Sequence, residues 1–453
     1  MHEALHVRSA LELAAMVARG DLSVVELTRL HLARVAALNT QLGAFVDLRP
    51  EAALKVARAR DAERHRDPRA ARSPLFGLPT GIKDLHLTRG FRTRFGSRAL
   101  PTIRSPLDDL TSAAVRRAGL VILGKLATSE LGILPVVETD LHPPVRNPWD
   151  VHRSSGGSSG GSSAAIAAGL IPLAPASDGA GSVRIPAAFC GLVGHKPTRG
   201  LVPNPFAALD AIDITVVGPH ARTVPDAAAL LDLLTGRERS PTSFLSGLER
   251  PPQALRVAFT AQSPVGPVEP AAVEAVRAVA ATLSELGHQV VEGAPLHGEI
   301  DEFLPIYKFS VGQAFTPLAR KLQPVGQWLR AEGRHVDWRT AMACRELLTR
   351  RLASWFDGID VLLTPTTPVA PPLVGAWQGL NGRDTMYAAA QLGAFTAAFN
   401  ATGQPATSIP VWQSEGPPRA VQLVGHRGED ALLLALAQSV LEARGDATGR
   451  VAP

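Results

Sequence analysis

The chain has 453 residues, of which 45 % are hydrophobic and 19 % charged, so it is not a disordered chain and can build one large core or two smaller ones. Its two cysteines, Cys190 and Cys344, are too few for a disulfide framework. Its net charge of +5 comes from scattered basic residues that 41 acidic residues offset, which argues against a nucleic-acid partner.

Two amphipathic helices are expected near the N-terminus. Apolar residues recur at helical spacing in 9–20 and 23–39. Ser9 and Ser23 suit N-caps, and the glutamates three residues later complete capping boxes. No signal peptide is indicated, and the longest apolar run, near 164–176, is too short and too broken by prolines to cross a bilayer. We therefore expect a cytoplasmic protein with no membrane partner.

Strands and helices alternate through the rest of the chain. Residues 74–84 indicate a strand that enters a loop, and residues 108–125 indicate a helix followed by a buried strand. The polar, proline-containing segment 237–253 is expected to be a loop. The alternation predicts an α/β protein with a largely buried sheet. Further strands are expected at 170–178, 256–260, 288–293, 358–365, 406–412 and 419–425, and further helices at 162–169, 270–286, 342–355, 387–400 and 430–444.

The sequence RSSGGSSGGSSAA, residues 153–165, has two opposed interpretations. Its composition is typical of a flexible linker. However, helix and strand patterns continue directly on both sides, which disfavours a domain boundary here. Residues 156–160 also fit the G-x-S-x-G nucleophile elbow, with Ser158 as the nucleophile, but the residues before them make a poor strand.

Metal motifs are missing from the sequence, and lysine is rare in it. There is no His-Glu-x-x-His or Cys-x-x-Cys motif, so we expect no metal and no cofactor. A lysine that persists among so many arginines suits chemistry in which a proton must be lost, which arginine cannot do. The lysines are Lys55, Lys83, Lys125, Lys196, Lys308 and Lys321.

A second small-residue segment, 179–181, leads into Ser182. Small residues let successive backbone N–H groups converge on one point, as an oxyanion hole requires. Taken alone, the segment also fits an ordinary glycine-rich turn.

Lys83, Ser158 and Ser182 lie 75 and 24 residues apart, in GLPTGIKD, the Gly/Ser run and ASDGAGSVRIPAAFCG. This spaced set resembles the amidase signature family, whose catalytic triad is Ser–cis-Ser–Lys. The resemblance is densest over 77–200, with outlying matches at 9–39, 360–372, 399–411 and 419–425. It implies the amidase signature fold, a large mixed twisted sheet covered by helices on both faces. It also implies a single domain over 1–453, with a signature core at about 70–200.

The resemblance assigns roles to the three spaced residues. Ser182 takes the position of the nucleophile, Ser158 that of the serine preceded by a cis peptide bond, and Lys83 that of the terminal base. A serine hydroxyl needs a base. Lysine, with a free pKa of about 10.4, serves as one only where burial lowers its pKa.

Neighbouring positions carry supporting roles in the family. An oxyanion hole is implied for the backbone N–H groups of Gly179, Ala180, Gly181 and Ser182. A polar scaffold is implied for Ser159, Asp178 and Arg184. Ala180 replaces a family glycine and would be strained at positive φ. This variant form resembles a subgroup that includes hydrolases of cyclic oligoamides and aryl acylamidases.

The resemblance implies a serine amidohydrolase that cleaves a carboxamide to a carboxylate plus ammonia or an amine through an acyl-enzyme on Ser182. The implied partner is a small-molecule amide, and a homodimer is a family-level expectation. One alternative is the glutamine-hydrolysing component of a tRNA-dependent amidotransferase, which works with a second subunit. Another is a non-catalytic binding protein on the same fold.

The substrate pocket is expected to draw its wall from the segment after Ser129 and from the variable region at about 299–393. The aromatic residues of that region could line an acyl pocket or could simply pack in the core. They are Phe303, Tyr307, Trp328, Trp338 and Trp377. Lys125 and Lys196, which lie in the signature core, are expected to be structural.

Overall fold

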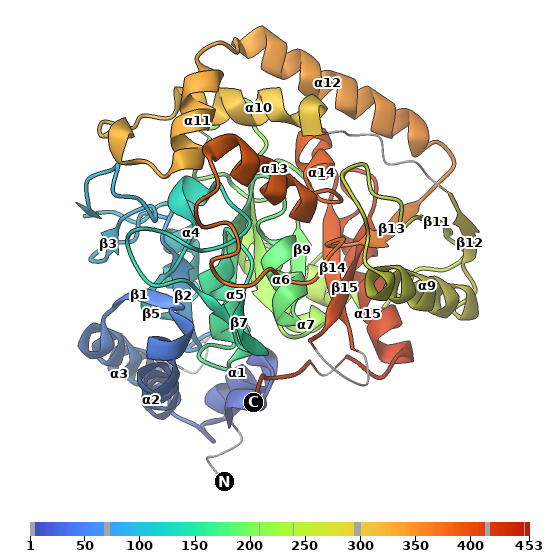
Figure 1. The fold of residues 1–453 in the computed structure, drawn as a ribbon. Helices are drawn as coiled ribbons and strands as arrows, with labels where there is room; N and C mark the ends of the chain where they lie inside the picture. The colour runs from blue at the N-terminus through green and yellow to red at the C-terminus, as the bar shows by residue number, and fades with distance from the viewer. Residues whose placement is uncertain are drawn as a thin grey trace.

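A mixed β-sheet runs through the centre of the molecule (Figure 1). The computed structural model describes residues 5–67, 73–207, 209–238, 240–293, 300–412, 417–447 and 449–453. Within these ranges the sheet has eight strands, in the order β12 (Gln289–Glu292), β11 (Arg256–Phe259), β13 (Val361–Pro365), β15 (Arg419–Val424), β14 (Ala406–Val411), β9 (Val193–Lys196), β10 (Val216–Ala221) and β8 (Leu173–Asp178).

Parallel and antiparallel pairings divide this sheet. Strand β11 pairs in parallel with β12 and β13, and the remaining neighbours pair antiparallel. Parallel neighbours need a crossover connection, and helix α9 (Pro270–Glu285) supplies the one between β11 and β12. The expectation of a mixed sheet is therefore confirmed.

A second sheet adjoins the first at the edge formed by β8. It contains three strands among the described residues, β1 (Phe45–Leu48), β5 (Val121–Leu126) and β2 (Pro79–Lys83). Strand β2 approaches β8 through its Thr80 hydroxyl, which donates to Leu173 O at 2.9 Å. This junction places Lys83, the last residue of β2, beside the end of β8. The two-stranded pairs β3 (Arg92–Thr93) with β4 (Ile103–Arg104) and β6 (Arg146–Asn147) with β7 (Asp150–Ser154) lie outside both sheets.

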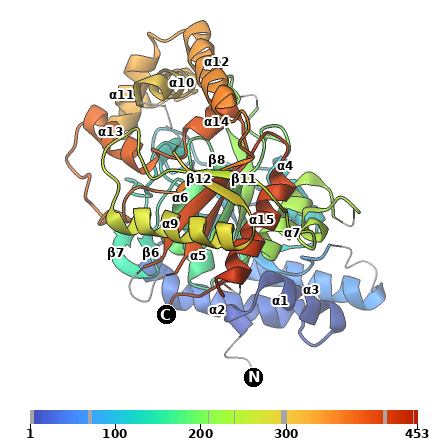
Figure 2. The same cartoon turned by 90° about the vertical axis from the view of Figure 1, so that its right-hand side faces the viewer.

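Helices surround the sheets (Figure 2). The first two helices start as predicted, because Ser9 with Glu12 and Ser23 with Glu26 form complete capping boxes. Helices α10 (Ile300–Gln313), α11 (Pro324–Gly333) and α12 (Trp338–Trp355) lie together on one side of the molecule, next to α13 (Gly382–Leu392) and α14 (Ala398–Thr402) (Figure 1). The other helices are α1 (Ala10–Arg19), α2 (Val24–Leu42), α3 (Pro50–Arg66), α4 (Leu110–Arg117), α5 (Gly160–Ala167), α6 (Arg184–Cys190), α7 (Val224–Thr235), α8 (Phe244–Gly247) and α15 (Asp430–Ala443).

A group of helices lies above the sheet, and we call it the cap. The sequence patterns predict only some of its helices. The cap comprises α10 (Ile300–Gln313), α11 (Pro324–Gly333), α12 (Trp338–Trp355), α13 (Gly382–Leu392) and α14 (Ala398–Thr402). An apolar cluster separate from the main core joins α10, α11 and α13 to Ile133 and Ile185. The cap thus closes over the part of the sheet where β8 ends.

Two expected elements differ in the structure. The single helix expected at 387–400 is two helices, α13 and α14, with a break at 393–397. The break is held by tertiary hydrogen bonds, because the Thr396 hydroxyl donates to Ala180 O at 2.8 Å. The loop expected at 237–253 contains the short helix α8, which Ser243 caps by accepting from Ser246 N. Residue 239 of that segment lies outside the described residues.

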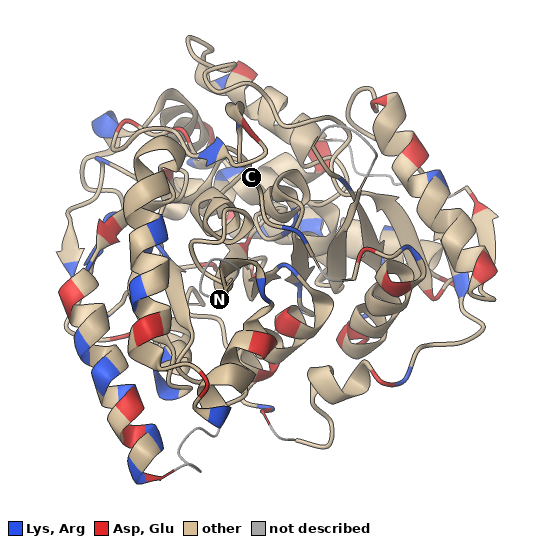
Figure 3. Ribbon diagram, turned by 90° about the horizontal axis from the view of Figure 1, so that it is seen from below, with Lys and Arg blue, Asp and Glu red and all other residues tan. Residues whose placement is uncertain are grey.

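Both charge signs mix on the outer helices. Lys and Arg alternate with Asp and Glu along α3 (Figure 3). No helix in the described ranges is long and apolar enough to cross a membrane.

The Gly/Ser run is an ordered part of the core and not a linker. Residues 154–165 are all buried, and α5 begins within the run. A Cβ at Gly161 would lie 2.4 Å from Ala127 N, 2.6 Å from Ala127 O and 2.7 Å from Ala44 O. Glycine is therefore required for α5 to approach the end of β5 so closely.

Replacing Gly161 by alanine should lower the free energy of unfolding by about 3 kcal/mol or more, because rigid backbone atoms occupy the space of the new methyl group. Gly247→Ala is the matched control. Its new Cβ would meet only the Ala431 Cβ, at 4.0 Å, so its stability should stay the same or rise by about 0.5 kcal/mol. Chemical denaturation of both variants measures the difference, and equal stabilities would contradict the close approach.

Candidate active site

Lys83 is fully buried at the end of β2, among four oxygen atoms. Its Nζ lies 2.8 Å from Ser158 Oγ, 2.8 Å from Ser159 Oγ, 3.0 Å from Ser177 Oγ and 3.3 Å from Ser177 O. Burial lowers the pKa of Lys83 to about 7, although the nearby Asp178 opposes the shift. An appreciable fraction of this amine is therefore neutral near pH 7.

Ser158 follows a cis peptide bond between Gly157 and Ser158, at the position where the resemblance implied one. The chain turns there through Gly156, whose φ is +80°. A Cβ at Gly157 would lie 2.7 Å from Val136 N. These glycines let the chain fit against the segment before it and direct the Ser158 hydroxyl toward Lys83.

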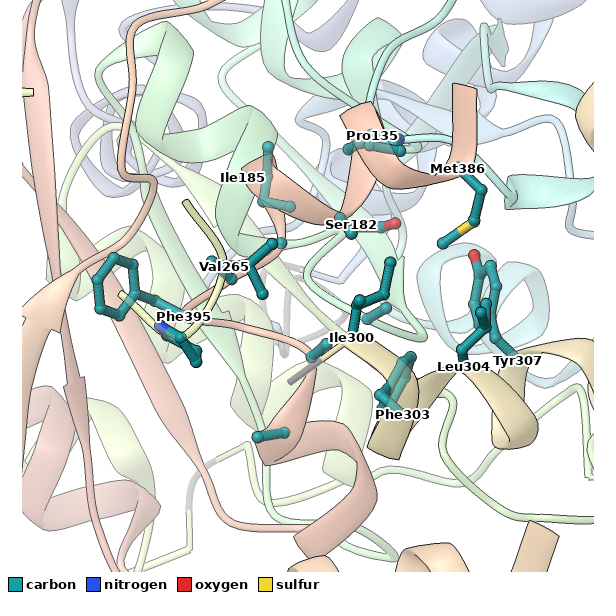
Figure 4. A pocket seen from close by; sticks show the side chains of 18 of the residues that line it. Pro135, Ser182, Ile185, Val265, Ile300, Phe303, Leu304, Tyr307, Met386 and Phe395 are labelled. Carbon is teal, nitrogen blue, oxygen red and sulfur yellow. The ribbon is translucent and has the colours of Figure 1, made fainter. Parts of the chain in front are cut away.

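Ser182 lies in the turn between β8 and α6, half-buried, with its hydroxyl facing an apolar cavity (Figure 4). Among the described residues its Oγ has no hydrogen-bond partner, so it is free to meet a bound molecule. The hydrogen bond from Ser158 to Ser182 that a proton relay needs is also not formed within the described part of the chain. A proton relay through the two serines therefore requires their hydroxyls to come within hydrogen-bond distance when substrate binds.

The turn before Ser182 takes its shape from Gly181 and not from Ala180. Gly181 has a φ of +129°, whereas Ala180 has no positive φ and is not strained. The Gly181 N–H donates to Asp178 Oδ1 at 2.5 Å, so it is not free to serve as an oxyanion donor. For the N–H groups of Gly179, Ala180 and Ser182, the described residues supply no acceptor.

Asp178 and Arg184 form a buried ion pair behind this turn. Arg184 Nε donates to Asp178 Oδ2 and Arg184 Nη2 donates to Asp178 Oδ1, both at 3.1 Å. Asp178 Oδ2 also accepts from Val183 N at 3.0 Å. Burial raises the pKa of Asp178, but the guanidinium more than offsets this and holds that pKa at about 2. The pair therefore stays charged and fixes both sides of Ser182.

Three residues that sequence reasoning missed complete this scaffold. Arg184 Nη2 donates to Asn400 Oδ1 at 2.6 Å, and Arg184 Nη1 donates to Gln422 Oε1 at 3.2 Å and to Thr396 O at 2.9 Å. Asn400 Nδ2 in turn donates to Asp178 O at 2.9 Å. The available signal was that Asn400 and Gln422 fall in the two C-terminal segments that carry the family resemblance.

The other two lysines of the signature core lie outside this constellation. Lys125 Nζ lies 3.2 Å from Asp84 Oδ1 and donates to His86 O and Thr93 Oγ1, both at 2.7 Å. Lys196 Nζ donates to Pro197 O at 3.0 Å, and burial followed by the Arg184 charge lowers its pKa to about 7. Neither lysine lines the cavity.

The nucleophile-elbow interpretation finds no support in the structure. Ser158 is only 2 % exposed and its hydroxyl contacts a lysine. Strand β7 before it belongs to a two-stranded pair outside the main sheet. In the described ranges, no group of three or more His, Cys, Asp or Glu side chains is placed to hold a metal ion.

An apolar cavity lies in front of Ser182, with a volume of about 80 Å³ open to the centre of a water molecule. Two of the five aromatic residues considered from sequence, Phe303 and Tyr307, line it. Trp338 is half exposed, and Trp328 lies under the Lys308 ammonium. The rest of the wall comes from α6, α10, α12, α13 and α14, from the break at 393–397, from the Ser182 turn and from the segments around 133–135 and 264–265. Residues after Ser129 and residues of 299–393 both contribute to this wall, and the expectation that they enclose the substrate stays a prediction.

Comparisons with known proteins find relatives along almost the whole chain. The family model described as Amidase matches residues 26–434. An acylamidase from Rhodococcus erythropolis is 33 % identical over 456 residues, covering 95 % of this chain and 94 % of that protein. A glutamyl-tRNA(Gln) amidotransferase component from Chloroflexus aggregans is 33 % identical over 472 residues, covering 95 % of each. The solved structure of a 6-aminohexanoate cyclic dimer hydrolase matches with a TM-score of 0.86 and 30 % identity, over 97 % of each chain.

The chain belongs to the amidase family and has the amidase signature fold. It is an amide-hydrolysing enzyme.

Breaking the buried ion pair should destabilise the protein. Arg184→Met removes five hydrogen bonds and leaves Asp178 charged and unpaired, so the free energy of unfolding should fall by about 3–5 kcal/mol. Arg350→Met, which breaks the exposed pair with Glu346, is the control and should change it by less than about 1 kcal/mol. Equal losses in a denaturant titration would show that the Arg184 network does not support the fold.

Proposed function

We propose that this amidase cleaves carboxamides through an acyl-enzyme on Ser182, with Lys83 as the base and Ser158 as the proton relay. The observation that carries the proposal is the fully buried Lys83, whose pKa is about 7, with Nζ 2.8 Å from Ser158 Oγ. Ser182, whose hydroxyl faces the cavity, is the next residue of the proposed relay.

The hydrogen bonds around Lys83 suit a base. A neutral amine has two N–H donors and one lone pair. Ser159 and Ser177 offer acceptors for both N–H groups. The lone pair is then left for the Ser158 hydroxyl, which donates its proton to Nζ.

The first half of the reaction forms the acyl-enzyme. Lys83 takes the Ser158 proton while Ser158 takes the Ser182 proton, and Ser182 Oγ attacks the carbonyl carbon. The free N–H groups of Ala180 and Ser182, together with that of Gly179, donate to the oxygen as it gains negative charge. The C–N bond then breaks as the nitrogen leaves with the proton returned from Lys83 through Ser158.

The second half releases the acid. Water attacks the acyl carbon and gives its proton to Lys83 along the same relay. The bond between the acyl carbon and Ser182 Oγ breaks as the proton returns to that oxygen. The products are a carboxylic acid and an amine or ammonia, and no redox partner is needed for the atoms and electrons to balance.

The two alternatives from sequence make different demands. The glutamine-hydrolysing component of an amidotransferase would act on glutamine together with its second subunit, whereas a binding protein would need no activated serine. No observation within the described residues favours either one. A cytoplasmic location and a homodimer stay predictions.

Ser182→Ala should lower kcat at least about 1,000-fold, because the acyl-enzyme cannot form without the hydroxyl. Hydrolysis of a neutral anilide such as hexananilide measures the loss. Ser162→Ala is the control, since Ser162 is a buried serine of the same Gly/Ser run whose hydroxyl has no hydrogen-bond partner in the described structure. A fluorophosphonate label should map to Ser182, and a label on Ser158 would overturn the assignment.

The pH dependence should report the Lys83 amine. Only the neutral amine accepts a proton, so kcat/KM should rise with pH through a midpoint near 7 and level off above it. Because burial also lowers the pKa of Lys196 to about 7, a Lys196→Met variant separates the two lysines. The midpoint should survive in that variant, and its disappearance there would assign the titration to Lys196.

A further inference from the structure

The cavity in front of Ser182 has an uncharged wall. Every described residue that lines it is aliphatic, aromatic, glycine or alanine, apart from Ser182 itself, the Met386 thioether and the Tyr307 hydroxyl. That hydroxyl already donates to Ile133 O at 2.7 Å. In Figure 4 the Ser182 hydroxyl points toward Met386 and Tyr307, and Ile300 and Phe303 lie below Ser182 in the view.

The acids of α10 nearest to this wall are occupied elsewhere. Asp301 accepts a hydrogen bond from the Tyr387 hydroxyl at 3.1 Å, and Glu302 pairs with Arg351. Neither acid lines the cavity. The charged Asp178–Arg184 pair is fully buried and satisfied behind the Ser182 turn. No described charged group therefore stands ready to neutralise a charge on a bound molecule.

We infer that the substrate is an uncharged amide with an extended apolar group that lies in this cavity. The inference rests on the proposed function, because it places the scissile carbonyl at Ser182. A charge brought into an unpaired apolar site loses its hydration without compensation, so a charged analogue binds far more weakly than a neutral one of similar length. Free amino-acid amides such as glutamine, which carry an ammonium and a carboxylate, are excluded by the same reasoning.

Binding to the full-length Ser182→Ala variant tests the cavity without turnover. Three anilides are compared: hexananilide, its 6-amino analogue charged on the acyl end, and hexanoyl-4-(aminomethyl)anilide charged on the amine end. Titration calorimetry at pH 7.5 should show hexananilide binding at least about tenfold more tightly than one of the charged amides. The weaker one identifies the half of the substrate that lies in the cavity. If both charged amides bind within about threefold of hexananilide, the inference is overturned.

A paired substitution in the wall tests the cause of the selection. Met386→Glu and Met386→Gln have nearly the same shape and differ in charge, and Met386 lines the cavity. In Met386→Glu the charged amide that the wild type disfavours should gain at least about tenfold in kcat/KM relative to hexananilide, whereas Met386→Gln should keep the wild-type ratio. Unchanged ratios in both variants would show that cavity charge does not set selection.

The two hypotheses fail in different ways. Tight binding of hexananilide by Ser182→Ala with no Ser182-dependent hydrolysis by the wild type would refute the proposed chemistry and leave the cavity assignment standing. If neutral and charged amides bind equally well and are hydrolysed at equal rates in a Ser182-dependent reaction, the cavity assignment is refuted and the proposed chemistry stands.

Discussion

The ion pair between Asp178 and Arg184 is the interaction on which the site depends. Asp178 ends β8, Arg184 begins α6, and both are fully buried. Asp178 holds the N–H groups on both sides of Ser182, and Arg184 reaches the break between α13 and α14 and strand β15. Because every polar atom of the guanidinium group has a partner, the cost of burying these charges is offset. One charge pair thus fixes the turn that presents the serine.

The same burial has the opposite consequence for Lys83. Arg184 is paired directly with Asp178, so that carboxylate is largely neutralised and gives Lys83 little support. No ion pair joins Lys83 to a carboxylate among the described residues, whereas Lys125 has one with Asp84. Desolvation is therefore the dominant effect, and it lowers the pKa of the Lys83 amine to about 7. An arginine at this position would stay charged and could not act as a base.

The cap of helices α10 to α14 lies over the sheet and helps to form the cavity in front of Ser182. The sheet, the Gly/Ser run and the Ser182 turn lie beneath it, and the cap together with the break at 393–397 supplies most of the cavity wall. Relatives of this chain carry names as different as acylamidase and glutamyl-tRNA(Gln) amidotransferase. A fold alone does not determine the substrate, so the chemistry of the wall has to decide it.

The sequence by itself determined the local features of this protein and the residues of its family motif. The capping boxes at Ser9 and Ser23 and the alternation of strands and helices were readable because they depend on neighbours a few residues away. The roles of Lys83, Ser158 and Ser182 came from a motif, and they stay predictions. The composition of the Gly/Ser run alone suggests a linker, and the helix and strand patterns on both sides of it argue against a domain boundary there.

The hydrogen bonds between distant segments depend on the tertiary structure alone. Asn400 and Gln422 meet Arg184 across more than 200 residues of sequence, and the helix expected at 387–400 breaks because Thr396 bonds to the Ser182 turn. Local periodicity records which face of a segment is apolar, but it does not record which distant polar group will satisfy a buried donor or acceptor, and only the packed fold settles that.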